Sequence, residues 1–231
     1  MTTLLPTRPA VLVIPAESVS RLYSQQGFYC NKQDVDLVMK AIDVHGCFVE
    51  REKAEQDTSL KQIVAYGLIR NHERILCVRR SRNNRRSNLR LRYTVLFGGH
   101  VDDVDRSSGD PLQDCLFREL REELNLVPRE PPHLLGSVAD PSSLGGQLHL
   151  GVIFEVRVAA GVIHVPASCD KQEFTHGRSR SSYSLERADD IKFSIHSFDP
   201  WSALVLSSTV FKRKLNAKRS LHYQLQLPLC G

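Results

Sequence analysis

The pattern of apolar and polar residues predicts a series of strands interrupted by three helices. Short apolar runs bounded by polar turns are typical of strands, and they occur at 11–14, 63–69, 75–78, 93–97, 133–138, 148–158 and 191–198. Apolar residues recur at helical spacing over 32–42, 110–126 and 200–211. Residues 50–61 are charged and predict an exposed connection, with a domain boundary near residue 58, whereas 167–190 are polar and predict irregular structure.

Length and composition favour one well-buried cytoplasmic domain. The 231 residues are 41% hydrophobic and 25% charged, which is ordinary for a globular chain. No apolar run approaches the roughly 18–20 residues of a membrane span, and the N-terminus lacks the apolar segment of a secretory signal. The six cysteines are widely spaced and include no CxxC pair. We therefore expect reduced thiols, without a disulfide scaffold or zinc ribbon.

The positive charge is concentrated in one segment. Seven arginines lie between Arg79 and Arg92 with no acidic residue among them, and they outnumber the net charge of +5. Such a segment suggests a polyanionic partner. Arg79 and Arg80 could grip substrate phosphates, the whole segment could contact RNA, or it could be a solvated loop. Few aromatic residues interleave with the arginines, which weakens the case for base stacking.

The helix over 110–126 has clear start and stop signals. Asp110 suits the N-cap, Pro111 the first helical position, and Gln113 completes a capping box. Asn125 tolerates the left-handed conformation that ends a helix. The expected apolar face consists of Leu112, Cys115, Leu116, Leu120 and Leu124.

Three glutamates share one face of this helix. Glu119, Glu122 and Glu123 fall at positions i, i+3 and i+4, a spacing at which like charges cost a few tenths of a kcal/mol per pair. Crowded carboxylates become favourable around a hard divalent cation such as Mg²⁺, which prefers oxygen ligands. The alternative is an acidic solvated face softened by Arg118 and Arg121.

The context of these glutamates resembles a known motif. A strand ends in Gly98-Gly99, a loop follows, and the helix then carries Arg-Glu-Leu-Arg-Glu-Glu-Leu-Asn-Leu at 118–126. This arrangement resembles the Nudix box, G-x5-E-x7-R-E-U-x-E-E-x-G-U, in which U is apolar. The matching positions are Gly99, Arg118, Glu119, Leu120, Glu122, Glu123 and Leu126.

Three positions depart from the box. Counting eight residues back from Arg118 leads to Asp110, where the family has Glu, and we expect this short side chain to serve only as the N-cap. The same count places an insertion of about five residues in the loop 102–109. Asn125 replaces the box glycine. The loop contains Asp102, Asp103 and Asp105, which could contact metal or keep the loop soluble, and we favour solubility.

The resemblance extends beyond the box and implies a fold. The hairpin 63–78, Gly98-Gly99-His100, the run 148–152 and Asp199-Pro200-Trp201-Ser202 are similar to a bacterial branch of predicted phosphoesterases in the Nudix family. This implies an α/β/α sandwich with a mixed sheet over residues 58–212. Residues 1–57 would form an N-terminal extension that packs on the core, and residues 213–231 a basic tail.

The resemblance also implies an activity. Nudix enzymes use Mg²⁺ or Mn²⁺ to hydrolyse a nucleoside diphosphate linked to another group by attack of water on phosphorus. By position, Glu119, Glu122, Glu123 and the Gly99 carbonyl would be metal ligands, and Arg118 would hold the glutamates in place. The expected substrate-binding residues are Arg79, Arg80, Gly98, Gly99 and His100.

Some assignments stay open at this level. Family members often use a further glutamate outside the box as ligand or general base, and here Glu173 is the first candidate, followed by Glu186 and Glu155. The alternatives to a pyrophosphohydrolase are a Nudix module that binds a nucleotide as a sensor, and an RNA-end processing or RNA-binding protein. The oligomeric state stays open as well, with a homodimer as one alternative, because Nudix domains are frequently dimeric.

Overall fold

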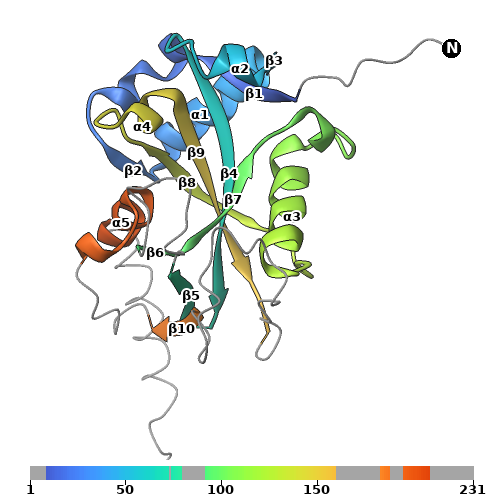
Figure 1. The fold of residues 1–231 in the computed structure, drawn as a ribbon, viewed down its shortest axis with the longest axis vertical. Coiled ribbons are helices and arrows are strands. Elements are labelled where there is room, and N and C mark those ends of the chain that lie inside the picture. The colour runs from blue at the N-terminus through green and yellow to red at the C-terminus, as the bar shows by residue number, and fades with distance from the viewer. Residues whose placement is uncertain (1–8, 73, 80–91, 160–182, 188–194, 209–231) are drawn as a thin grey trace, which may run out of the picture.

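A mixed β-sheet flanked by helices forms the protein (Figure 1). The computed structural model describes residues 9–72, 74–79, 92–159, 183–187 and 195–208, with the side chains of 183–187 not included. Its strands are β1 (Ala10–Pro15), β2 (Gly27–Tyr29), β3 (Cys47–Glu50), β4 (Leu60–Asn71), β5 (Arg74–Arg79), β6 (Tyr93–Thr94), β7 (Leu96–His100), β8 (His133–Ala139), β9 (His149–Arg157) and β10 (Tyr183–Arg187). The mixed α/β class predicted from the resemblance is confirmed.

Strand β4 is the centre of the sheet. One edge of β4 pairs in turn with β1, β7 and β5, all antiparallel, and the other edge pairs in parallel with the whole of β9. The sheet continues from β9 through β8 to β2, and from β5 to β10. Because β4 is enclosed on both edges and both faces, it is buried along almost its whole length, and its central residues 63–69 form the mainly apolar run that is typical of buried strands.

Helices cover the two faces of the sheet. The α-helices are α1 (Lys32–His45), α2 (Arg51–Ala54), α3 (Pro111–Leu124), α4 (Leu144–Leu148) and α5 (Pro200–Ser207), with 3-10 segments η1 (Ala16–Tyr23), η3 (Asp103–Asp105) and η4 (Ile195–Ser197). α3, α1 and η1 contribute to one apolar core, and α5 to a second core. Figure 1 shows α3 and α5 on opposite sides of the central strands.

The N-terminal segment joins the same sheet. Strand β1 pairs with β3 and with the start of β4. The Leu12 amide donates a hydrogen bond to the Val101 carbonyl at 2.7 Å, directly after β7. Among the described residues, no helix is both long enough and apolar enough to cross a membrane.

Several predicted elements differ from the structure. The predicted strand 93–97 is two strands, because the Val95 amide donates to the Ser202 hydroxyl at 3.1 Å instead of continuing a ladder. The charged segment 50–61 is not a plain connection, since it contains α2 with a fully buried Ala54 and the start of β4. In both segments, contacts with residues distant in the sequence override the structure that the local pattern of apolar and polar residues predicts.

The C-terminal predictions also need correction. The segment 167–190, predicted to be irregular, includes strand β10, which pairs with β5. The predicted strand 191–198 is wrong over 195–197, which form the 3-10 segment η4, and residues 191–194 lie outside the described ranges. The predicted helix 200–211 ends at Ser207, because Ser208 adopts an extended conformation. The proposed tail 213–231 lies outside the described residues.

Glu155, a candidate for the additional glutamate, is part of a buried ion pair in β9. Its side chain is 8% exposed and lies 3.0 Å from Nη1 of Arg70, which is 10% exposed. Arg157 donates a second bond at 2.7 Å. Burial alone would raise the pKa of Glu155, but the hydrogen bonds from the two arginines outweigh it and lower the pKa. The Glu155 carboxylate is therefore occupied in holding β4 to β9.

We predict that Glu155→Gln destabilises the fold by about 3 kcal/mol at neutral pH, because it leaves the Arg70 charge buried without its counter-charge. The pKa of Glu155 is lowered by folding, so its contribution is complete above the carboxyl's ordinary pKa and is lost as pH falls through the folded pKa. Urea unfolding of both proteins at neutral and acidic pH measures this. A difference that does not shrink in acid would contradict it.

Candidate active site on helix α3

Helix α3 is positioned by both of its predicted caps. The Asp110 carboxylate accepts a hydrogen bond from the Gln113 amide at 3.2 Å, and Pro111 occupies the first turn. At the other end Asn125 has φ 48°, the left-handed conformation expected of a residue that replaces a glycine. All five residues of the predicted apolar face are buried, namely Leu112, Cys115, Leu116, Leu120 and Leu124.

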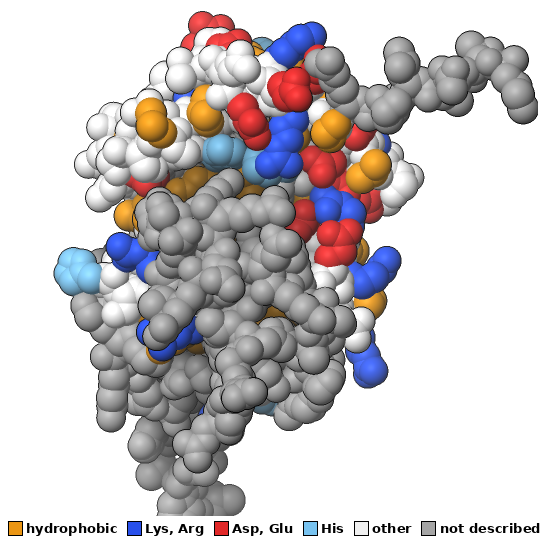
Figure 2. Space-filling model, viewed as in Figure 1, with side chains coloured by type: hydrophobic (Ala, Val, Ile, Leu, Met, Phe, Trp, Pro, Cys, Tyr) orange, Lys and Arg blue, Asp and Glu red, His pale blue; other side chains and the backbone are white. Residues whose placement is uncertain are grey.

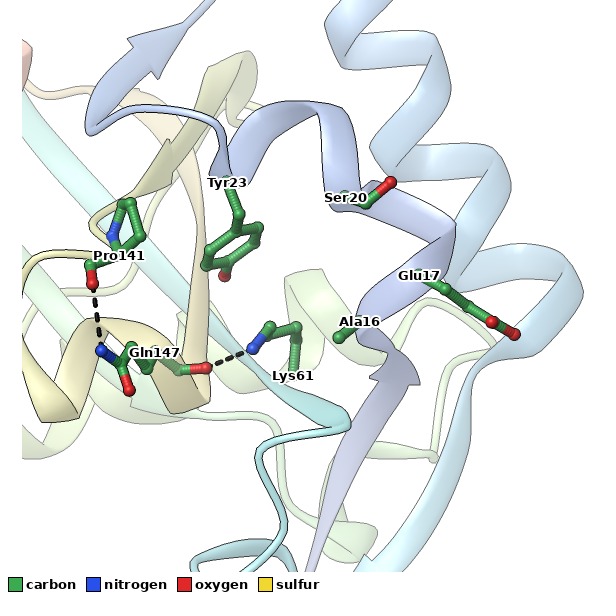
Figure 3. Close-up of a pocket in the computed structure, with 7 residues that line it drawn as sticks. All are labelled: Ala16, Glu17, Ser20, Tyr23, Lys61, Pro141 and Gln147. Atoms are coloured by element: carbon green, nitrogen blue, oxygen red, sulfur yellow. Dashed lines mark hydrogen bonds between the residues drawn. The ribbon is translucent and has the colours of Figure 1, made fainter.

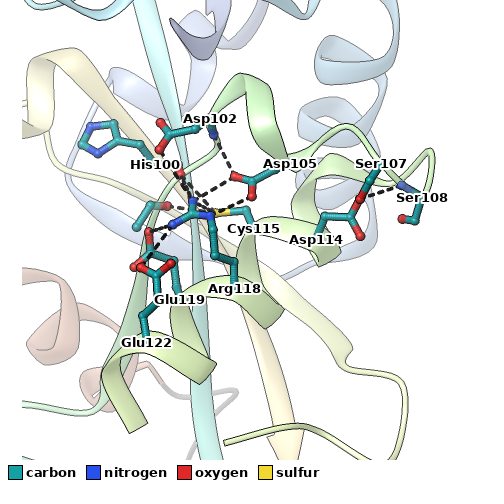
Figure 4. A network of polar contacts seen from close by, with 11 residues as sticks. His100, Asp102, Asp105, Ser107, Ser108, Asp114, Cys115, Arg118, Glu119 and Glu122 are labelled. Atoms are coloured by element: carbon teal, nitrogen blue, oxygen red, sulfur yellow. Dashed lines mark hydrogen bonds and ion pairs between the residues drawn. The ribbon is translucent and has the colours of Figure 1, made fainter. Parts of the chain in front are cut away.

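Arg118 is the centre of a polar network beside the helix (Figure 4). Its guanidinium donates to both carboxylate oxygens of Asp105, at 2.8 and 2.9 Å, and to Glu119 Oε1 at 2.7 Å. A further bond reaches the carbonyl of His100 at 3.2 Å. The Asp105 carboxylate is the main reason that the pKa of Arg118 is raised. Bidentate pairing of this kind fixes the orientation of the arginine as well as its charge.

Asp105, not Asp110, is the acidic partner of Arg118. Asp105 is 3% exposed and lies six residues after Gly99, which is the spacing of the box glutamate when counted from the glycine. The prediction that Asp105 only keeps the loop soluble is therefore wrong, whereas the predicted insertion stays in the loop before α3, after Asp105. The additional residues lie between Asp105 and Arg118. The prediction that Asp110 serves as a cap is confirmed.

Two glutamates of α3 approach the backbone of β7. The Gly98 amide donates to Glu123 Oε2 at 3.0 Å. A Cβ on Gly99 would lie 2.3 Å from Glu119 Oε1, so only glycine leaves room for that carboxylate. Burial raises the pKa of Glu119, opposed by the positive charge of Arg118.

The third glutamate points outward. The Glu122 side chain is 61% exposed, and its Oε2 lies 3.7 Å from Arg118 Nη1. Within the described ranges, no three acidic, histidine or cysteine side chains already converge around one point. The donor set nevertheless suits a hard divalent cation, because it consists of carboxylate oxygens next to a glycine that admits one of them. The Gly99 carbonyl oxygen itself lies 3.6 Å from Cys115 Sγ.

The other predicted site residues fall in different places. Arg79 ends β5, and its guanidinium lies 5.7 Å from the ring centre of Tyr93. Arg80 and Glu173 lie outside the described residues, and Glu186 is described only as a backbone position in β10. Acidic and basic side chains interleave on the face near α3 and the loop after β7 (Figure 2).

A pocket of about 420 Å³ lies away from the α3 glutamates, on the N-terminal segment (Figure 3). The buried Lys61 lines it, lies 4.7 Å from the ring centre of Tyr23, and donates to the carbonyls of Thr58 and Gln147. Burial lowers the pKa of Lys61. The amino group of Lys61 in this pocket is therefore already hydrogen-bonded to backbone carbonyl oxygens of the protein.

Sequence reasoning missed two residues near the site. Asp105 could have been found by counting forward from Gly99 as well as back from Arg118. His149 could not, because only the sheet brings it to His100, 49 residues away in the chain.

We predict that Asp105→Asn lowers the free energy of unfolding by about 2 kcal/mol, because the half-buried Arg118 loses charge-assisted hydrogen bonds to the buried Asp105 carboxylate. The matched control is Asp103→Asn, which removes an exposed carboxylate two residues away and is expected to change stability by less than about 0.5 kcal/mol. Urea denaturation of the three proteins provides the comparison. Equal effects of the two substitutions would show that the Arg118 pairing is not a structural requirement.

Comparison with known proteins finds the following similarities. Protein YmaB of Bacillus subtilis (strain 168) is 26% identical over 157 residues, covering 65% of this chain and 76% of YmaB. The crystal structure of Tm1382, assigned to the Nudix hydrolases, superposes with a TM-score of 0.66 at 23% identity, over 90% of this chain and 99% of that one. The NUDIX domain of Shewanella oneidensis NrtR, crystallised with ADP ribose, is 11% identical with a TM-score of 0.42, covering 69% of this chain and 88% of that one.

The family model for the NUDIX domain matches residues 60–194, which is more than half of the chain. The matched segment contains β4, β7, β9 and the whole of α3. The chain therefore belongs to the Nudix hydrolases, enzymes that act on pyrophosphate bonds.

Proposed function

We propose that this protein is a metal-dependent pyrophosphohydrolase that cleaves the diphosphate linkage of a nucleotide or nucleotide conjugate, with Mg²⁺ or Mn²⁺ as cofactor. The observation that supports this most directly is the position of Glu119 and Glu123. Both carboxylates lie against the backbone of Gly98-Gly99, and Arg118 is fixed beside them by Asp105.

In this proposal the metal ligands are Glu119, Glu122, Glu123 and the Gly99 carbonyl. A bound divalent ion would polarise phosphoryl oxygens and lower the pKa of a coordinated water. Grouping three carboxylates on one helix costs electrostatic energy unless a cation offsets it. The guanidinium of Arg118 lies 2.7 Å from Glu119 Oε1 and 3.7 Å from Glu122 Oε2, and it offsets part of that repulsion.

Arg118 is a positioning residue in this mechanism. It donates to Glu119 Oε1 and takes its own orientation from the two oxygens of Asp105. Its positive charge opposes the rise in the pKa of Glu119 that burial causes. The Arg118 charge thereby favours the ionised form of Glu119, which is the form that binds a cation.

The substrate contacts are proposals of the same kind. Gly98, Gly99 and His100 would lie along the reacting diphosphate, and Arg79 and Arg80 would grip its outer phosphates. Glu173 is the proposed general base. The proposed nucleotide partner is a small molecule. Contact with RNA through Arg79–Arg92, a homodimer and a cytoplasmic location stay predictions, as do the limits of the extension 1–57, the domain 58–212 and the tail 213–231.

We predict metal-dependent release of phosphate or nucleotide from at least one member of a substrate panel. The panel holds nucleoside triphosphates, ADP-ribose, dinucleoside polyphosphates, nicotinamide dinucleotides, nucleotide sugars and 5′-capped or triphosphorylated RNA, each assayed with Mg²⁺ and with Mn²⁺. Glu123→Gln is expected to lower turnover at least about a hundredfold, because it removes a metal-binding charge.

The matched control is Glu130→Gln, an exposed glutamate after α3, which should retain wild-type turnover. Turnover that persists without metal, or that survives Glu123→Gln, would refute the proposed site. If folded protein binds a nucleotide but hydrolyses no member of the panel, the nucleotide-sensor alternative replaces the enzyme.

A further inference from the structure

Two histidines face each other beside the proposed active site. Nε2 of His100 lies 2.9 Å from Nε2 of His149, and the ring centres are 4.9 Å apart with an interplanar angle of 67°. Both residues are only half-buried. In Figure 4 the imidazole of His100 points away from the Arg118 network. The two imidazoles are therefore not among the proposed metal ligands Glu119, Glu122 and Glu123, and the backbone of His100 is the part of that residue next to the Arg118 network.

The register of the sheet explains why the side chains of His100 and His149 lie close together. His100 of β7 is the cross-strand partner of Val64, and His149 of β9 is the partner of Gln62. Val64 and Gln62 are two residues apart on β4, so their side chains share a face. Cross-strand partners also share a face, which puts both histidines on the same side of the sheet. Gly99 faces α3, so its neighbour His100 faces the opposite way.

The second nitrogen of His149 fixes its tautomer. Nδ1 lies 2.5 Å from the carbonyl oxygen of Gly145, and since a carbonyl only accepts, Nδ1 carries the proton. In the neutral ring, Nε2 of His149 therefore presents a lone pair toward His100. Metal-binding histidines characteristically donate their other N–H to a carbonyl in this way, which orients the ring.

The spacing of the two nitrogens suits a shared ion. Bonds of about 2.1 Å from each imidazole nitrogen to one metal are typical, and two nitrogens 2.9 Å apart then subtend about 90° at it. That angle is the one between neighbouring positions of an octahedron. Imidazole ligands suit Zn²⁺, Ni²⁺ and Co²⁺, whereas carboxylates suit Mg²⁺ and Mn²⁺. The pair would therefore select a different ion from the glutamates.

Gln62 is a candidate third donor, because the register puts it on the same face of the sheet as the two histidines. Gln62 is fully buried, and within the part of the chain that the structure describes its amide oxygen and nitrogen have no hydrogen-bond partner. A buried amide without a partner costs about 1–3 kcal/mol. Gln62 is the neighbour of His149 across the parallel ladder. The Gln62 amide oxygen would gain the partner it lacks by binding the ion or a water molecule coordinated to the ion.

We propose that His100 and His149 bind a divalent transition-metal ion through their Nε2 atoms, with Gln62 as an amide-oxygen donor and the remaining positions filled by water. The site is separate from the glutamate site, because Gly99 faces α3 and the His100 side chain lies on the opposite face of β7. It also stands independently of the hydrolytic function, since no step of that reaction is required for binding.

Co²⁺ is the probe that tests the proposal. The full-length protein is stripped of metal and titrated with Co²⁺ in an excess of Mg²⁺, which occupies carboxylate sites, and visible absorption of the bound ion is recorded. We expect one Co²⁺ per chain in the wild type and in the Glu119→Gln/Glu123→Gln double variant. Zn²⁺ should displace it. Absence of a bound Co²⁺ in the wild type would overturn the proposal.

The histidine variants decide where the ion binds. His100→Gln and His149→Gln are each expected to weaken Co²⁺ binding at least as much as loss of an outer-shell partner does, about 10–100-fold. The matched control is His133→Gln, an exposed histidine on β8 that should bind like the wild type. Equal affinity in all three variants would place the ion elsewhere and refute the site.

A measurement on the wild type covers the case in which a variant fails to fold. In ¹⁵N spectra of the histidine side chains, Zn²⁺ should shift the Nε2 resonances of two rings. The Nδ1 resonances of the same rings should keep the chemical shifts of nitrogens that do not bind the metal. If Zn²⁺ moves no pair of Nε2 signals, the close nitrogens are a simple hydrogen bond in which His100 donates to His149, and the proposal fails.

Discussion

The ion pair between Arg118 and Asp105 is the constraint on which the arrangement of the site depends. Helix α3 carries its glutamates at spacings where they repel one another, and the loop before it also bonds to the helix where Ser107 and Ser108 donate to Asp114. One guanidinium reaches both oxygens of Asp105, the Glu119 carboxylate and the His100 carbonyl. It therefore fixes the distance between β7, the loop and the helix in a single group of contacts.

The N-terminal segment supports this arrangement from the other side. Leu12 bonds to the Val101 carbonyl, and Val11 forms an isolated bridge with Asp102, so the chain leaving β7 is an extension of the β1 ladder. Asp102 and Asp105 cap each other across η3. Nearby, the Arg106 guanidinium lies 5.1 Å from the ring centre of Phe48 in β3. The start of the loop is consequently held between β1 and α3. Additional residues can therefore be accommodated later in the loop, between Asp105 and α3.

Strand β7 places two kinds of chemistry on its two faces. Gly99 admits a carboxylate on the side of α3, where oxygen donors favour hard cations. His100 turns its imidazole to the other side, where His149 supplies a second nitrogen. A period of two residues is sufficient to separate the proposed oxygen site from the proposed nitrogen site, although the two share one stretch of backbone.

The sequence by itself determined the elements whose causes are local. The caps Asp110 and Asn125, the apolar stripe of α3 and the hairpin of β4 and β5 follow from periodicity and capping, which act within a few residues. The family and its fold followed from the order of glycine, arginine and glutamates around that helix. Where long-range partners compete with local preference, as at Val95 and Ser202, the predicted strand was wrong.

Only the tertiary structure decided which distant groups meet. Counting along the chain gives Asp105 from Gly99 and Asp110 from Arg118, and only the path of the loop decides that Asp105 reaches the guanidinium. The pairing of β4 with β9 places Glu155 in an ion pair with Arg70. The register of β4 with its two neighbouring strands places His149 next to His100. Side-chain pairing across a sheet depends on register, and register is a property of packed strands that no single strand sequence contains.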